Sequence, residues 1–155
     1  MNPNETLIHK FYTAFSNCDF KEMANCYHQN IIFEDPAFGI LHGESVKKMW
    51  QMLIEKSKGN IKIDFSKLIA NEFSGSVHWI ATYNFSQTNR KVVNIIDAKF
   101  EFRDGLISKH TDNFDLFKWS KQALGWKGFL LGWTDFMKNK IRKTAQKSLE
   151  IYLKK

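Results

Sequence analysis

The strongest constraint on the fold lies in the second half of the chain, where four runs of alternating apolar and polar residues follow one another. They cover 61–70, 76–86, 91–102 and 106–116, and the short segments between them contain Asn, Asp, Gly, Ser or Thr. A period of two is typical of a strand with one face in the core. Short connections of this composition join neighbouring strands in an antiparallel manner. The sequence therefore predicts an antiparallel meander with one apolar face.

The first half of the chain predicts helices. Apolar residues recur at three- and four-residue spacing over 4–17 and again over 43–55, and Asp19 is placed to cap a short second helix that ends near Tyr27. A short strand is expected over 30–35. Helices that precede a meander, instead of alternating with its strands, indicate an α+β fold.

Length and composition favour one globular domain in a reducing compartment. The chain has 155 residues, of which 14 are Phe, 5 Trp and 4 Tyr, enough rings to fill a core and to line a cavity. The first 30 residues carry several charges, and no apolar run reaches the roughly 20 residues of a membrane span. Cys18 and Cys26 form neither a disulfide framework nor a metal motif. A cytoplasmic location is expected.

The net charge of +7 is concentrated at one end of the chain. Residues 116–155 contain ten Lys or Arg and two acids, whereas the rest of the chain is nearly neutral. We expect a domain over 1–117 and a basic helical extension over 118–155. The extension contains an apolar stretch, 129–133, which follows Gly128 and is interrupted by Gly132. The amphipathic helix from 134 on can pack on the body or on a partner subunit, or contact anionic lipids. Nucleic acid is not an expected partner, because no nucleic-acid-binding motif accompanies the charge.

Two segments resemble a known superfamily. Phe11–Asp19 and Phe33–Pro36 are similar to the NTF2-like superfamily, and within it to the SnoaL-like and ketosteroid isomerase-like branches; the resemblance runs from about residue 5 to 116. The segment 110–125 resembles an uncharacterised bacterial subgroup. The resemblance implies a cone in which a curved antiparallel sheet wraps around the N-terminal helices and leaves a small-molecule pocket at its open end. It also implies a homodimer through the outer face of the sheet.

The resemblance suggests roles for two carboxylates. The catalytic base of ketosteroid isomerase falls on Asp35, but its tyrosine falls on Phe11 and its second aspartate falls near Asp97, which the strand pattern places outward. A steroid isomerase is therefore not expected. The late-strand aspartate that SnoaL-like cyclases use for acid–base chemistry falls nearest to Asp112.

Three residues are candidates for proton transfer: Asp35, His110 and Asp112. Asp35 follows Phe33 on a face expected to point inward, where loss of water raises the pKa of a carboxylate toward that of a general base. His110 and Asp112 lie two residues apart on one strand face, and an imidazole beside a carboxylate can relay a proton. The structural alternatives are that Asp35 caps a turn and that the other two face outward in a dimer.

Candidates for ligand binding are one amide and several rings. Asn94 lies among apolar residues, so its amide is expected to bind a ligand carbonyl or to join His110 in a hydrogen-bond network. The aromatic candidates are Tyr12, Phe15, Tyr27, Trp50, Trp79 and Tyr83, although rings at such spacing also form cores. The histidines share no ligand spacing, so no metal and no other cofactor is expected.

Two hypotheses follow from these residues. In the first, the chain binds a small apolar or aromatic molecule and acts as an isomerase, cyclase or dehydratase that needs no cofactor. In the second, it is a non-catalytic, dimeric binding or scaffold module whose helix over 134–155 contacts a membrane surface or a partner protein.

Overall fold

The computed structural model describes residues 1–131 and 134–155, so the predicted interruption at Gly132 lies outside the described residues. Helices and strands follow in the order α1 (Pro3–Ser16), α2 (Phe20–Asn25), β1 (Tyr27–Asp35), β2 (Gly39–His42), α3 (Glu44–Ser57), β3 (Lys62–Ala70), β4 (Ser74–Phe85), β5 (Arg90–Arg103), β6 (Leu106–Asn113), α4 (Leu116–Leu124), α5 (Trp126–Leu131) and α6 (Asp135–Leu153). The predicted α+β class is confirmed.

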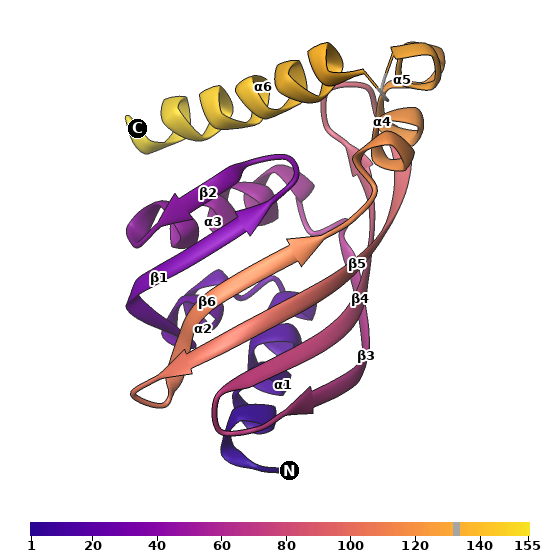
Figure 1. Cartoon of the computed structure of the whole chain (residues 1–155). Coiled ribbons are helices and arrows are strands. Elements are labelled where there is room, and N and C mark those ends of the chain that lie inside the picture. The colour runs from indigo at the N-terminus through magenta and orange to yellow at the C-terminus, as the bar shows by residue number, and fades with distance from the viewer. Residues whose placement is uncertain (132–133) are drawn as a thin grey trace.

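One curved sheet forms the wall of a cone around α1 (Figure 1). Its strand order is β2-β1-β6-β5-β4-β3. The predicted meander is confirmed, since β3, β4, β5 and β6 pair antiparallel in sequence order. The expectation of a wholly antiparallel sheet is wrong, because β1 pairs with β6 in parallel. The edge strand β2, which pairs antiparallel with β1, was not predicted; its four residues are too few to show a period.

Side-chain caps explain where the first helices begin. The Asn2 side chain accepts a hydrogen bond from the Glu5 amide, and the Glu5 carboxylate accepts one from the Asn2 amide. This capping box satisfies amides that have no partner inside α1. Asp19 caps α2 as predicted, since its Oδ1 accepts from the Glu22 amide at 3.0 Å.

The last strand departs from the predicted alternation. Ile107, His110 and Asp112 are all buried, although Ile107 and His110 are three residues apart. The pairing of β5 with β6 shifts between Glu101 and Phe102, and such a bulge turns the following side chains to the other face. The predicted alternation over 106–116 is therefore interrupted between Ile107 and His110.

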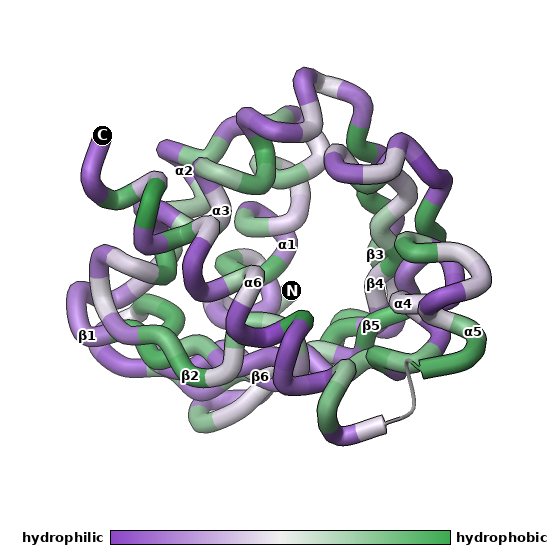
Figure 2. Tube along the Cα trace, turned by 90° about the horizontal axis from the view of Figure 1, so that it is seen from above, coloured by the Kyte–Doolittle hydropathy of each residue, from purple (hydrophilic) through white to green (hydrophobic). Residues whose placement is uncertain are grey.

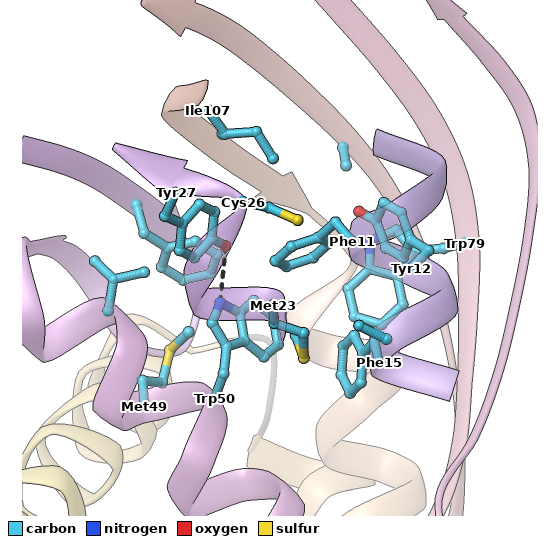
Figure 3. Packing of buried hydrophobic residues seen from close by; sticks show 14 of the residues in the cluster. Phe11, Tyr12, Phe15, Met23, Cys26, Tyr27, Met49, Trp50, Trp79 and Ile107 are labelled. Carbon is cyan, nitrogen blue, oxygen red and sulfur yellow. Dashed lines mark hydrogen bonds between the residues drawn. The ribbon is translucent and has the colours of Figure 1, made fainter. Parts of the chain in front are cut away.

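The core is built from aromatic rings that α1 carries into the concave face of the sheet (Figure 3). The Phe15 ring contacts Trp50 edge-to-face with centroids 5.1 Å apart, and Tyr12 stacks on Phe65 at 5.4 Å. Such contacts add to the stability gained by burying the rings. Trp79 from β4 lies against Phe15 at 5.5 Å. The aromatic rings thus fill the space between α1, α3 and the concave face of the sheet.

Helix α6 lies across the top of the cone, opposite the N-terminus (Figure 1). Its apolar residues Met137, Ile141 and Leu149 are buried. The Gln146 side chain donates to the Phe38 carbonyl at 2.9 Å, and the Tyr152 hydroxyl donates to a Glu55 carboxylate oxygen at 2.7 Å. The helix therefore packs on the body along its apolar face.

No helix among the described residues is long and apolar enough to cross a membrane.

Candidate functional site

A cavity of about 550 Å³ lies at the wide end of the cone, between the sheet, α3 and the C-terminal helices. Its wall is largely apolar and aromatic. Four polar side chains from separate strands reach it, namely Asp35 from β1, Tyr83 from β4, Asn94 from β5 and Asp112 from β6. An apolar cavity with a few convergent polar groups is typical of a small-molecule site.

The parallel pairing of β1 with β6 brings the two carboxylates together. Phe33 lies opposite His110 and Glu34 opposite Thr111. The next step along both strands puts Asp35 at the level of Asp112. Because side chains alternate along a strand, both carboxylates point to the cavity side of the sheet.

Asp112 is held by two nitrogen donors. Its Oδ1 accepts from the Trp79 indole at 3.2 Å and pairs with His110 Nε2 at 2.9 Å. Its Oδ2 has no hydrogen-bond partner among the described residues, and the side chain is only 3% exposed. Both hydrogen bonds of Asp112 to described residues thus use Oδ1.

A buried chain of hydrogen bonds continues behind Asp112. The Trp50 indole donates to the Tyr27 hydroxyl at 2.9 Å (Figure 3), and that hydroxyl pairs with His110 Nδ1 at 2.7 Å. Since Tyr27 accepts from Trp50, its own proton goes to His110 Nδ1, and His110 donates through Nε2 to Asp112. With these directions every donor in the chain has an acceptor.

Asp35 occupies a different environment. Burial raises the pKa of its carboxyl to about 7; the nearby charge of Asp112 also raises this pKa, and the Phe38 and Ala37 amides that bind its Oδ1 lower it. Asp35 therefore closes a turn, as one alternative proposed, and also lines the cavity. Near neutral pH the group is present both as acid and as carboxylate.

The structure divides the sequence-predicted site residues into two groups. Lining the cavity are Asp35, Asp112, Asn94, Phe15, Trp50, Trp79 and Tyr83. Outside its lining are His110, Tyr12 and Tyr27, which are fully or almost fully buried in the core. His110 contacts two lining residues, Asp112 through a hydrogen bond and Trp50 through ring stacking, and Asn94 lies in the wall at 8% exposure.

Sequence reasoning missed the part of the wall that the C-terminal helices supply. Trp119 lines the cavity and donates to the Tyr83 hydroxyl at 2.8 Å. Met137, Lys140 and Ile141 of α6 line it as well. Their helical period predicted an apolar face but not what that face would contact. Among the described residues, no three His, Cys, Asp or Glu side chains gather as metal ligands.

Two buried tyrosines are expected to respond oppositely to loss of the hydroxyl. The Tyr12 hydroxyl has no partner among the described residues, and an unsatisfied buried donor is costly, so Tyr12→Phe should raise the free energy of unfolding by about 1 kcal/mol. Tyr27→Phe removes the partner of both Trp50 and His110 and should lower it by about 1–3 kcal/mol. Urea denaturation of both variants checks this, and equal effects would contradict the assigned network.

The chain is similar to one protein family and to several solved structures. The family model described as a SnoaL-like domain matches residues 8–110. No curated protein sequence matches the chain. Structural neighbours include a candidate polyketide cyclase from Xanthomonas campestris pv. campestris (16% identity, 79% of this chain and 98% of that chain, TM-score 0.62). A candidate isomerase from Rhodopseudomonas palustris is similar over 81% of this chain and 98% of its own, at 16% identity and a TM-score of 0.63.

An LEH-like epoxide hydrolase of M. tuberculosis is similar over 84% of this chain and 94% of its own, at 17% identity and a TM-score of 0.61. At these identities the likeness concerns the fold. The three neighbours are named for different reactions, so the likeness selects none of them.

Proposed function

Because the chain belongs to the SnoaL-like domain family, we propose that its cavity binds a small apolar or aromatic molecule and transfers protons on it without a cofactor. One observation carries the proposal: two carboxyl groups in different environments, Asp35 and Asp112, line the same apolar cavity. Pairs of titratable groups whose surroundings differ are the usual source of a matched acid and base.

The proposed step moves one proton at each carboxyl group. Asp112 Oδ2 takes a proton from a carbon next to a carbonyl; the C–H electron pair forms the carbon–carbon double bond of an enol, and the carbonyl oxygen takes the proton of the Asp35 acid. If a second double bond is conjugated to the enol, Asp112 returns its proton to the far carbon while Asp35 takes back the enol proton, which gives an isomer. If the enol carbon instead attacks a second carbonyl, that carbonyl oxygen takes the proton of Asp112 and Asp35 takes back the enol proton, which closes a ring. Both carboxyl groups end the cycle as they began, so protons and electrons balance within the site.

The wall residues have supporting roles in this proposal. His110 fixes Oδ1 of Asp112 through Nε2 and so directs Oδ2 toward the ligand; it acts as a positioning residue. The amide of Asn94 and the hydroxyl of Tyr83 are within the cavity lining and would orient the substrate carbonyl. Phe15, Trp50 and Trp79 supply ring faces for an aromatic ligand.

The test is hydrogen exchange at carbon, which can be measured whichever product the reaction forms. The purified protein is incubated in D₂O with a panel of apolar ketones and polyketide-like aromatics, and deuterium uptake is followed by mass spectrometry. Thermal shift on the same panel reports binding; a ligand at 100 times its Kd adds about 2.7 kcal/mol. Binding with protein-dependent exchange supports the proposal. Binding without exchange on any ligand leaves a binding protein, and no binding contradicts both.

A second candidate, a non-catalytic dimeric module that contacts a membrane surface, is favoured by exposed apolar residues. In α5 and at the start of α6, Trp126, Phe129 and Phe136 are 69%, 63% and 75% exposed, and Figure 2 shows hydrophobic positions at the end of α5. On the outer sheet face, Ile95 is 57% exposed and Val93 40%, which suits a dimer. Exposed apolar patches of this kind mark interaction surfaces.

Vesicle binding with a matched pair of variants tests this candidate. Phe136 and Phe73 are both 75% exposed, but Phe73 lies beside the β3–β4 turn, away from the basic helices. If the exposed apolar residues of α5 and the start of α6 bind bilayers, Phe136→Ser should reduce co-sedimentation with anionic vesicles several-fold. Phe73→Ser should leave it unchanged. Light scattering gives the mass in solution. If Phe136→Ser still binds vesicles but has the mass of a monomer where the wild type has the mass of a dimer, the patch is the contact with a second copy of the chain instead.

A further inference from the structure

Three lysines from separate helices reach the same cavity. Lys56 at the end of α3, Lys127 in α5 and Lys140 in α6 all belong to its lining, and all three are exposed. None of their ammonium groups forms an ion pair with a described residue. The Lys127 ammonium lies 5.9 Å from the centroid of the Trp126 ring, another lining residue. The outer part of the cavity therefore carries three cations that no described carboxylate neutralises.

The inner part of the cavity carries the opposite charge. Asp112 is 3% exposed and Asp35 is partly buried, whereas the three lysines stand in solvent. Most of the remaining wall is apolar, with Trp50, Trp79 and Ile96 among its members. The lining thus combines buried or half-buried carboxyl groups, apolar side chains and lysines on its solvent-exposed side.

We propose that the ligand is an amphipathic acid, whose anionic group binds at Lys56, Lys127 and Lys140 and whose neutral, reacting end faces Asp35 and Asp112. This inference rests on the proposed function and names its substrate class. An anion at the inner end would meet the charge of Asp112 at short range in a poorly solvated site, which is unfavourable. At the opening the same anion gains three cations. An apolar or aromatic body then spans the wall between them.

The three lysines differ from an ordinary basic surface because three separate helices bring them to the lining of one cavity. Helix α6 carries other lysines, and two of them, Lys143 and Lys147, are exposed but do not line the cavity. They provide the matched control, because the double replacement Lys143→Gln/Lys147→Gln lowers the charge of the same helix without touching the opening.

The experiment compares ligands that share one apolar body. 1-Pyrenebutyrate and 1-pyrenebutanol form one pair, followed by pyrene fluorescence, and dodecanoate and dodecanol form a second pair, followed by calorimetry. We expect each acid to bind the full chain about 5-fold or more tightly than its alcohol at low salt, and the advantage to shrink at about 0.5 M salt. Lys56→Gln/Lys127→Gln/Lys140→Gln should abolish most of that ratio, while the Lys143→Gln/Lys147→Gln control retains it.

Three outcomes overturn the inference, and they differ in what they say of the proposed function. If acid and alcohol bind equally tightly, the ligand needs no anionic group; this contradicts the inference but not the proposed function. An advantage lost equally in both lysine variants assigns the effect to overall charge and not to the opening. Failure of every acid and every alcohol to bind contradicts this inference and the binding that the proposed function requires.

Discussion

Asp112→Asn is expected to slow deuterium exchange into a bound substrate by about 100- to 10,000-fold, the usual contribution of a positioned general base. The variant loses the carboxylate that would take the proton. It keeps an oxygen at the position of Oδ1, which can still accept from the Trp79 indole and His110 Nε2. Kd for the ligand should therefore change little, and the loss should appear in kcat. Exchange is measured by mass spectrometry alongside ligand titration.

Asp97→Asn is the matched control for this prediction. Asp97 lies on β5, on the outer face of the sheet, where its Oδ1 pairs with His78 Nδ1 at 2.8 Å and its side chain is 76% exposed. The Asp97→Asn variant should therefore exchange deuterium into the substrate at the wild-type rate. If Asp112→Asn retains full exchange, or if both variants lose it equally, Asp112 is not the base.

Asp35→Asn is expected to stabilise the protein at alkaline pH and to leave it unchanged near pH 4. The folded-state pKa of Asp35 is raised from 3.8 to about 7, so between these values the folded state binds more protons than the unfolded state. Stability contributed by the protonated carboxyl is therefore complete below pH 3.8 and lost as pH rises toward 7. Allowing for partial solvent access, the wild type should lose about 2 kcal/mol across this range, and the variant should not.

The measurement is urea denaturation of both proteins at about pH 4, 5.5 and 8, a series that runs from just above the lower pKa to above the higher one. The asparagine oxygen can still accept from the Ala37 and Phe38 amides that Asp35 binds, so the turn is preserved. Asp64→Asn, at an exposed position on β3, is the control for removal of a surface charge. Parallel pH profiles for wild type and Asp35→Asn would contradict the raised pKa.

Local periodicity was enough to predict most of the elements. The alternation over 61–113 depends only on neighbours in the chain, and it predicted the four strands and their order as a meander. The helical spacing of Phe11 and Phe15 predicted α1, and the position of Asp19 predicted the start of α2. These features follow from the sequence because each is decided within about four residues.

The candidate site depended on contacts that no local pattern contains. Parallel pairing brings Asp35 to the level of Asp112 across 77 residues of chain, and the bulge near Phe102 changes which residues of β6 face inward. The same is true of His110, whose imidazole lies behind the cavity wall, where the Tyr27 hydroxyl pairs with its Nδ1 and itself accepts from the Trp50 indole.

The C-terminal helices show the same division most clearly. The apolar stripe of Met137, Ile141 and Leu149 was visible in the sequence, and so was the basic character of this segment. Which surface the stripe would cover was not visible, because burial of an apolar face is favourable against any complementary apolar surface. Only the tertiary structure places α6 over the cone, where its apolar face becomes cavity wall and Lys140 joins the opening.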